Sequence, residues 1–596
     1  MNRSLHTLAW LGTKYRAAGP RRFVRRAVQI WADGGPGRLR DHWMHAGAAG
    51  SRERRYRSWM RSDEPRLIEA ERKRLGVDDP EFARRGPMIS IVIPAFDTSD
   101  WMLRRCLRSV IEQRYPHWEV VLVDDASPTD RVRRVAKEFA HDSRIRLDRL
   151  TRNHGIAAAT NRGIELASGP FVALLDHDDE LSPFALELVA GRIIAEANLD
   201  LIYSDEDKID AAGRRHNPAF KPDFSPAYLL ECNYICHLAV YRTELLRDLG
   251  GLRSEFNGAQ DYDLVMRATE RTRRIAHIPF VLYHWRTHDG STAGFGDAKP
   301  EAVEAGRRAV AKAIERRGVA GRVEHGPFLL TYDARPELDE DDRVALLIRS
   351  GDGGASERSL TVDRIRTQAR IGAVDAADEW RQVDAMLRVP APMAPRYLLW
   401  MDGDLLPEVD DWLTRLIQCA RLHGGPVTGR IVDAGRRVES AGLVIDHGGL
   451  VVPAYAGANA REPGYLWSLL SARNCDAAPV SCLLIERFLA ERAWLLVTGE
   501  PGARERWGAA WNVALSVAAT ALGRPPVVDS RVTFRRESRR DATEESRLVL
   551  RDLPEWAPSS RSFIVRLDEI EPAYAPRPRR RSDPVVRRSG EVTRSQ

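Results

Sequence analysis

The chain has 596 residues, of which 43% are hydrophobic and 30% are charged, proportions that are typical of globular proteins. This length exceeds the size at which a single hydrophobic core stops growing, so the sequence predicts two or more domains. No stretch approaches the ~20 consecutive apolar residues of a membrane span, and the first residues do not form a convincing signal peptide. Six scattered cysteines favour buried thiols over zinc ligands, and hence a cytoplasmic location.

The net charge of +6 is unevenly distributed along the chain. Residues 1–86 carry 20 Lys and Arg against 10 Asp and Glu, which predicts a basic helical N-terminal arm. Within this arm, residues 21–31 place apolar side chains on one helical face flanked by arginines. The pattern suits a helix on an anionic membrane surface, or equally a helix packed on the protein's own body. The basic tail, residues 557–596, is expected to be largely disordered, and neither basic end has the interleaved aromatic residues of a nucleic-acid-binding surface.

From residue 88 the sequence alternates between strand and helix patterns. Apolar runs predict strands at 89–96, 118–125, 144–150 and 171–175, and amphipathic stretches predict helices at 99–113, 129–140 and, after a loop, within 153–169. This alternation is typical of an α/β fold with a mostly parallel sheet flanked by helices. Ligands of such sheets bind beyond the carboxyl ends of the strands.

Acidic side chains gather where these strands end. Asp97 follows the first strand, Asp124 and Asp125 end the second, and Asp176, Asp178 and Asp179 follow the fourth. Like charges at this spacing disfavour one another unless something positive lies among them. Hard divalent cations such as Mg²⁺ and Mn²⁺ prefer carboxylate oxygens. The residues alone also allow a polar turn after a strand.

Six motifs, in this order, resemble the family-2 glycosyltransferases, and specifically the sugar transferases of bacterial surface-polysaccharide synthesis. They are ISIVIPAFDT, VVLVDDASPTD, FVALLDHDDELSP, LIYSDEDKIDAAGRR, FNGAQDYDLVMR and VLYHWRTHDGSTA. The resemblance covers about residues 55–320 and implies a nucleotide-sugar-binding domain of the GT-A fold. It implies inverting, hexosyl or deoxyhexosyl transfer from a nucleotide-sugar donor to a saccharide acceptor, with Mg²⁺ or Mn²⁺ assisting departure of the diphosphate. A lipid-linked acceptor, reached at the inner face of the cytoplasmic membrane, is one possibility.

The resemblance also implies where the metal and the nucleotide bind. Asp178 and Asp179 are the expected metal ligands together with His284, and His288 is the alternative histidine. The residues expected at the nucleotide are Asp97, Asp124, Asp125, Asn153, Gly155, Asn161 and Asp176. Simple turn chemistry is the alternative explanation for Asn153 and Gly155.

An inverting transfer needs a base that takes the proton of the acceptor hydroxyl. By resemblance this base is Asp261 in GAQDYDLVMRA, whereas Asp263 can be a helix-start charge favoured by the helix dipole. Trp285 and Arg286 are expected to close over the sugar or the diphosphate, since an arginine fork pairs bidentately with phosphate.

A second, altered copy of the pattern follows the first. YLLWMDGDLLP mirrors FVALLDHDDELSP and retains Asp402 and Asp404. The positions that correspond to the base and to the metal histidine hold Asn512 and Arg535, which can neither act as a carboxylate base nor bind a metal. We therefore expect a degenerate second GT-A-like domain, with a second active site as the alternative.

The expected organisation is an arm (1–86), a catalytic domain (87–335), a degenerate domain (336–556) and a tail (557–596). A non-catalytic scaffold that binds saccharide or nucleotide is the alternative function. A nucleotidyltransferase is disfavoured, because the segment PAFDTSDW after the first strand lacks the glycines and basic residues of an activation loop.

Overall fold

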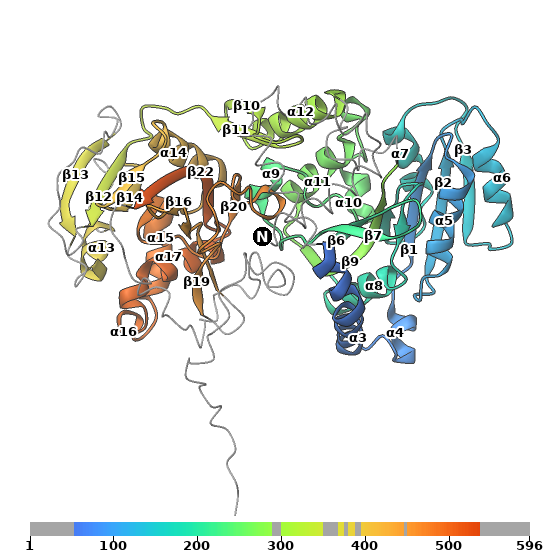
Figure 1. The fold of residues 1–596 in the computed structure, drawn as a ribbon, viewed down its shortest axis with the longest axis horizontal. Helices are drawn as coiled ribbons and strands as arrows, with labels where there is room; N and C mark the ends of the chain where they lie inside the picture. Colours follow the sequence, from blue (N-terminus) through green and yellow to red (C-terminus); the bar gives the residue numbers. More distant parts are fainter. Residues whose placement is uncertain are drawn as a thin grey trace, which may run out of the picture.

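A computed structural model of the chain describes residues 53–288, 300–349, 367–374, 379–387, 395–445 and 450–536. In these ranges the chain folds into two large mixed β-sheets with helices packed against them (Figure 1). The basic segment 21–31 and the C-terminal tail lie outside the described residues. Among the helices described, none combines the length and the apolar character that a membrane span requires. The six cysteines are free thiols, as expected, and five of them are buried.

The first sheet has the strand order β3-β2-β1-β4-β8-β6-β9-β5, with β7 paired to β6. Its strands are β1 (Ile89–Ala95), β2 (Trp118–Asp124), β3 (Ile145–Arg149), β4 (Phe171–Leu174), β5 (Glu180–Leu181), β6 (Leu201–Ile209), β7 (Arg215–Ala219), β8 (Ala239–Arg242) and β9 (Ile275–Arg286). Strands β1 to β4 run parallel, whereas β8 is antiparallel to both β4 and β6. The predicted mostly parallel sheet is therefore found for β1 to β4. Beyond β4 the sheet is mixed, because β6 and β9 run parallel whereas β5, β7 and β8 pair antiparallel with their neighbours.

The helices between the first four strands confirm the predicted alternation. They are α5 (Asp100–Ile111), α6 (Arg131–Glu138) and α7 (Ile156–Leu166). Successive residues of β1 point to opposite faces, so that Val92 packs in the core on the α7 side while Ile91 and Ile93 pack on the α5 side. Burial on both faces explains why β1 appears in the sequence as an unbroken apolar run.

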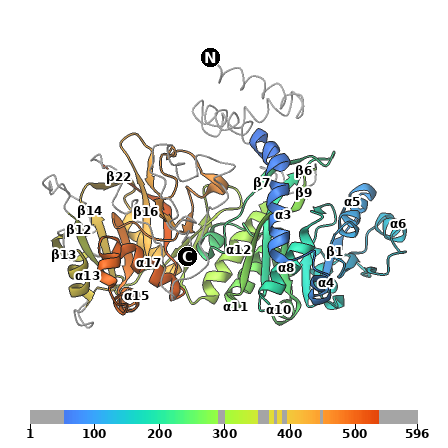
Figure 2. The same cartoon turned by 90° about the horizontal axis from the view of Figure 1, so that it is seen from below.

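The first half of the described chain, residues 53–316, contains further helices that surround this sheet. They are α3 (Glu64–Leu75), α4 (Pro80–Arg85), α8 (Ala185–Ala195), α9 (Pro226–Glu231), α10 (Thr243–Asp248), α11 (Gln260–Arg271) and α12 (Pro300–Arg316). Helix α3 lies beside α8 (Figure 2), where Arg72 and Glu187 form an ion pair at 3.0 Å. Arg215 of β7 pairs with Glu64 of the same helix at 2.7 Å. The described part of the basic N-terminal segment thus packs on the first half.

The second sheet has the order β13-β12-β14-β21-β16-β22-β15, with β17 paired to β16 and β20 to β22. Its strands are β12 (Val344–Arg349), β13 (Thr367–Val374), β14 (Tyr397–Asp402), β15 (Leu405–Pro407), β16 (Val427–Val432), β17 (Val438–Ser440), β20 (Ala472–Asn474), β21 (Cys482–Glu486) and β22 (Val527–Arg536). The helices are α13 (Glu379–Leu387), α14 (Trp412–His423), α15 (Arg487–Thr498), α16 (Ala503–Trp507) and α17 (Trp511–Ala521). A short pair, β18 (Leu443–Ile445) and β19 (Val451–Pro453), lies beside it.

The two sheets share their strand order and strand directions. Strands β12, β14, β21, β16, β22 and β15 follow one another as β1, β4, β8, β6, β9 and β5 do. Each pairing has the same direction in both sheets, parallel between β1 and β4 as between β12 and β14, and antiparallel between β4 and β8 as between β14 and β21. The second half therefore repeats the strand arrangement of the first.

The two halves are joined through shared contacts. Strands β10 (Gly321–His325) and β11 (Tyr332–Pro336) form a two-stranded sheet between them (Figure 1). One apolar cluster includes Tyr228 and Tyr262 from the first half together with Tyr455 and Leu469 from the second. Because this cluster is continuous, the second half is in packing contact with the elements that follow β6 in the first.

Candidate active site

The turn after β4 concentrates three carboxylates at the end of a buried strand. Asp179 is fully buried, and its two oxygens accept hydrogen bonds from the Arg286 backbone amide at 2.7 Å and the Tyr283 hydroxyl at 2.5 Å. Burial, with the charges of Asp178 and Asp176, holds the pKa of Asp179 well above its ordinary value. This turn is therefore electrostatically unfavourable without a compensating positive charge.

A histidine from another strand completes a group that could bind a cation. Ligand atoms of Asp176, Asp179 and His237 all lie within 4.8 Å of one another. The ring of His237 is stacked on Tyr283 with 4.6 Å between ring centroids, which fixes its orientation, and its edge meets Trp285. Two carboxylates and one imidazole form a donor set that suits Mn²⁺ or Mg²⁺, and Asp179, the buried member of the group, lies between two further carboxylates of the same turn.

Neither of the two histidines expected at the metal belongs to this group, and only one of them lies at the acidic turn. Nδ1 of His284 is 2.6 Å from Oδ1 of the fully buried Asp207, so His284 belongs to a separate hydrogen-bonded pair. His288, the alternative, contacts Asp178 through Nε2 at 2.8 Å. Sequence reasoning missed His237, which precedes β8 in the unremarkable stretch NYICHLAV. No local sequence pattern marks His237, because the pairing of β8 with β4 in the folded sheet is what brings it to the acidic turn.

Arg286 supports the acidic turn from within. Its guanidinium is 1% exposed, donates from Nε to the carbonyl of Asp178 at 2.7 Å, pairs with Glu180 and lies over the Trp101 ring. The phosphate contact expected for Arg286 stays a prediction, which the contacts of this buried side chain do not favour. The arginine instead fixes the path of the chain through Asp178 and Asp179. Trp285 borders His237, as a residue near the donor would.

At the end of β2, Asp125 orders the loop that precedes α7. Its carboxylate oxygens accept hydrogen bonds from the backbone amides of His154 and Gly155, both at 2.8 Å. Gly155 has φ 84°, and a Cβ there would lie 2.9 Å from Nδ2 of Asn257, so this position requires glycine. Asn153, in the same loop, is exposed. The predicted residues Asp125, Asn153 and Gly155 therefore belong to one structural unit.

The neighbouring strand ends are linked through Ser127. Its hydroxyl accepts a hydrogen bond from the Asp97 amide at 2.9 Å, and its own amide donates to Asp124 at 2.9 Å. Asp97 has φ 44°, an uncommon conformation for a non-glycine residue at the end of a strand. Asn161, by contrast, bonds through its side-chain amide to both backbone groups of Leu252, at 2.7 and 2.8 Å. Its side chain therefore holds α7 against the segment that follows α10 (Thr243–Asp248).

Asp261 lies in the first turn of α11 and faces the same acidic group. Its Oδ2 accepts a hydrogen bond from Nδ2 of Asn233 at 2.8 Å. Burial raises the pKa of Asp176, the imidazole of His237 lowers it, and the charges of Asp178 and Asp261 raise it further. Asp261 is therefore within electrostatic reach of Asp176.

Asp263, the other acidic residue of this turn, has a different environment. It is fully buried, and its carboxylate accepts hydrogen bonds from Arg253 at 3.0 Å and Arg267 at 2.9 Å. Both oxygens of this carboxylate are engaged by arginines in the interior, away from any acceptor hydroxyl. Of the two residues, Asp261 is the one placed to accept a proton.

The corresponding turn of the second half holds its own cation. Arg536, only 2% exposed, donates to Asp402 at 3.1 Å, to Asp404 at 2.7 Å and to Glu439 at 2.8 Å. Asn512 is buried and donates to the carbonyl of Ala478 at 2.9 Å, and Arg535 is exposed. The guanidinium of Arg536 thus neutralises the retained pair Asp402 and Asp404. The arginine that the sequence comparison identifies, Arg535, is instead the exposed neighbour.

Comparisons with known proteins agree with this geometry. The model of the family described as "Glycosyl transferase family 2" matches residues 90–250. The chain is 34% identical over 446 residues to protein y4gI of Sinorhizobium fredii (68% of this chain, 49% of that protein). It is 38% identical over 316 residues to the O-antigen biosynthesis protein RfbC of Myxococcus xanthus (53% and 24%). It is 33% identical over 205 residues to the PGL/p-HBAD biosynthesis glycosyltransferase of Mycobacterium bovis (33% and 77%).

The chain spans about half of the length of the first of these relatives and about a quarter of the second. It covers 77% of the mycobacterial glycosyltransferase at 33% identity. The family match begins in β1 and extends past β8, so it contains the acidic turn, Asp125 and His237. On these grounds the chain belongs to glycosyl transferase family 2.

Proposed function

We propose that the chain is an inverting, metal-dependent glycosyltransferase that moves a hexosyl or deoxyhexosyl group from a nucleotide sugar to a saccharide in bacterial cell-surface polysaccharide synthesis. Family membership supports sugar transfer, and the relative named for O-antigen biosynthesis supports the polysaccharide context. The observation that carries the mechanism is the position of Asp261, held by Asn233 and within electrostatic reach of the Asp176–Asp179–His237 group.

Asp261 would act as the general base. Its carboxylate takes the proton of the acceptor hydroxyl while that oxygen forms a bond to the anomeric carbon of the donor. The bond from the same carbon to the diphosphate oxygen breaks with its electron pair, and attack from the opposite face inverts the configuration. The hydrogen bond from Asn233 leaves the second carboxylate oxygen of Asp261 to receive the proton.

Asp176, Asp179 and His237 would hold the divalent cation. When bound, the cation would supply positive charge against the departing diphosphate. The residues around this group orient its donors: Tyr283 stacks on His237 and hydrogen-bonds Asp179, and the Arg286 amide binds the other oxygen of Asp179. Asp179 and His237 are thereby presented in fixed positions.

The nucleotide is proposed to lie along the carboxyl ends of β1, β2 and β4, where the loop ordered by Asp125 borders the acidic turn. We further propose a lipid-linked acceptor at the cytoplasmic face of the membrane, supported by the basic segment 21–31. For the second half we propose a degenerate GT-A-like domain without catalysis, supported by the repeated strand order and by Arg536 at its acidic pair.

The test is a donor panel with the purified full chain. UDP-, GDP- and dTDP-sugars are incubated with Mn²⁺ or with EDTA, and release of nucleoside diphosphate is measured. We expect Mn²⁺-dependent release with at least one donor, and Asp261→Asn to lower it by about 10²–10⁴-fold. Glu255→Gln, an exposed acidic residue just before α11, is the matched control and should keep wild-type turnover. Full activity of Asp261→Asn would refute the base assignment.

A further inference from the structure

The short helix α9 (Pro226–Glu231) lies between the two halves and is held by the second half at both ends. It belongs to the first half in sequence, in the connection between β7 and β8. Its residue Ala227 is nevertheless fully buried in the hydrophobic core of the second sheet, with Leu399 and Leu484. The position of α9 therefore depends on the second half.

Asn474, the last residue of β20, holds the N-terminal end of α9. Its Oδ1 accepts hydrogen bonds from the Ser225 hydroxyl at 3.0 Å and from the Ala227 amide at 3.1 Å. Its backbone amide donates to the Ser225 hydroxyl at 3.2 Å, and its Nδ2 donates to the carbonyl of Pro526. The Asn474 side chain thereby satisfies a backbone donor that the first turn of α9 leaves without a helical partner.

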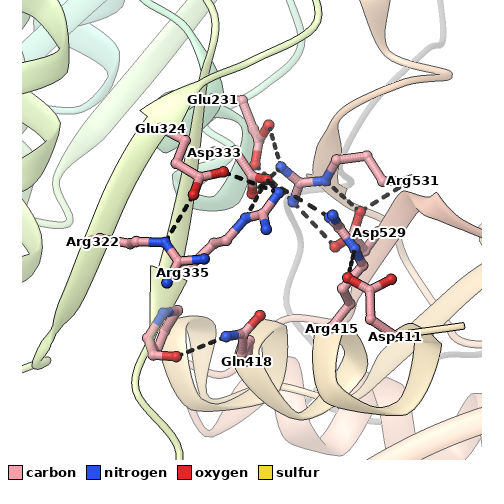
Figure 3. Close-up of polar contacts among 11 residues, drawn as sticks. Glu231, Arg322, Glu324, Asp333, Arg335, Asp411, Arg415, Gln418, Asp529 and Arg531 are labelled. Carbon is pink, nitrogen blue, oxygen red and sulfur yellow. Dashed lines mark hydrogen bonds and ion pairs between the residues drawn. The ribbon is translucent and has the colours of Figure 1, made fainter.

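Arg531 of β22 holds the other end. Its two terminal nitrogens each lie 3.2 Å from a different carboxylate oxygen of Glu231, the last residue of α9 (Figure 3). The same guanidinium pairs with Asp529 at 2.8 Å and with Asp333 of β11 at 2.6 Å. Burial, together with Asp333 and Asp529, raises the pKa of Glu231 to about 8, so its ionised form depends on Arg531.

The segment that follows α9 leads directly into the candidate active site. Asn233, two residues beyond Glu231, donates the hydrogen bond to Asp261 and accepts one from the Cys236 amide at 3.2 Å. The Tyr262 hydroxyl ties α11 back to the Leu229 carbonyl at 2.6 Å. His237 ends the segment beside Asp176. Two contacts of the proposed chemistry therefore depend on the path of residues 225–237.

We propose that the second half is a positioning element for the active site of the first, in which Asn474 and Arg531 clamp α9 and thereby set Asn233 against Asp261 and His237 against Asp176. The role of Asp261 in this inference rests on the function proposed above, whereas the clamp itself does not. Asn474 and Arg531 are positioning residues, because they touch neither substrate nor reacting atoms and act through α9.

Hydrogen exchange of the full chain without ligand tests the clamp. Asn474→Ala removes the N-terminal hold without leaving an unpaired charge, and Arg531→Lys keeps the charge but loses the two-pronged contact. We expect the amides of residues 226–237 to exchange about tenfold faster in either variant, with β1 unchanged. Arg536→Lys, at another arginine of the same strand that pairs with several carboxylates, is the matched control and should leave residues 226–237 at the wild-type rate. An unchanged rate in Asn474→Ala would overturn the clamp.

Steady-state kinetics then test its effect on chemistry, with the nucleotide sugar of the panel that the wild type turns over fastest. We expect kcat of Asn474→Ala to fall about tenfold while KM for the donor changes less than twofold, since the nucleotide edge at β1 and β2 is remote from α9. Faster exchange with unchanged kcat would overturn the positioning role. No turnover of any donor by the wild type would instead refute the proposed function, and the exchange rates alone would decide the clamp.

Discussion

Nε2 of His237 lies 3.9 Å from a carboxylate oxygen of Asp176. Asp176 follows β4 and His237 precedes β8, and these two strands pair antiparallel, so that the end of β4 faces the start of β8. This arrangement brings an imidazole to an acidic turn from a segment 61 positions further along the sequence. It makes the cation-binding group a property of the sheet and not of a single motif.

His237→Ala should weaken Mn²⁺ binding by about tenfold or more, because it removes one of the three proposed ligands. His284→Ala is the matched control and should leave the affinity nearly unchanged, since His284 is paired with Asp207. Free Mn²⁺ can be measured by electron paramagnetic resonance during titration of the full chain. A larger loss of Mn²⁺ affinity in the His284 variant would instead support His284, the residue that the family resemblance implies, as the metal ligand.

Strands β1, β2 and β4 were predictable because most of their residues are buried on both faces, whereas β3 is partly exposed and has a weaker pattern. The side chains of β1 are all apolar or small, and β2 is apolar apart from Glu119 and Asp124, which leaves nearly unbroken runs in the sequence. The mixed part of the sheet was not predictable in the same way. Strand β8 lies between β4 and β6 although it follows both in sequence, and this order depends on long-range packing.

The residues of the candidate site also differ in whether a local sequence motif or a long-range contact places them. Asp125, Asp176 and Asp261 could be found because each lies in a local motif at a strand end or a helix start. The burial of the Arg286 side chain could not be predicted, because its partners, the Asp178 carbonyl and the Glu180 carboxylate, come from the distant turn after β4. The contact between Asn233 and Asp261 was missed for the same reason, since an asparagine in a connecting segment carries no local signal of its partner.

Asp125→Ala should open the loop before α7. The substitution leaves the amides of His154 and Gly155 without their charged acceptor, at an expected cost of about 2–4 kcal/mol. Hydrogen exchange of residues 153–160 should therefore accelerate by at least about tenfold. Asp130→Ala, an exposed aspartate at the start of α6, should leave this exchange unchanged. Equal protection in both variants would show that the loop does not depend on Asp125.

Arg536→Met should destabilise the second half by about 3–5 kcal/mol, because it leaves Asp402 as a buried charge without its guanidinium partner. Millimolar Mn²⁺ should raise the melting temperature of this variant more than that of the wild type, since Asp402, Asp404 and Glu439 would then surround a vacated cation position. Arg535→Met, at the exposed neighbouring residue, should melt within about 1 °C of the wild type, because surface changes are usually small. Calorimetry of the wild type and the two variants measures these melting temperatures. Equal melting temperatures of both variants would contradict the interpretation that Arg536 neutralises Asp402 and Asp404.

Glu231 should make the stability of the interface between the halves depend on pH. Burial and the charges of Asp333 and Asp529 raise its pKa to about 8 despite Arg531, whereas an exposed glutamate has a pKa near 4.5. Between these values the folded chain holds a proton that the unfolded chain has lost, so the contribution to stability is present below the lower pKa and disappears as the pH rises through the higher one. The loss is at most about 5 kcal/mol.

Glu231→Gln isolates this contribution because the amide has nearly the same shape and does not titrate. Wild type should lose more thermal stability than the variant between pH 5 and pH 8.5, and the two should lose stability in parallel above pH 9. Titrating groups remote from Glu231 are common to both proteins and cancel in the difference. Equal losses over the lower range would mean that Glu231 is already ionised at pH 5, held so by Arg531. The contact at the C-terminal end of α9 would then be a full ion pair throughout the physiological range, and its strength would not respond to pH.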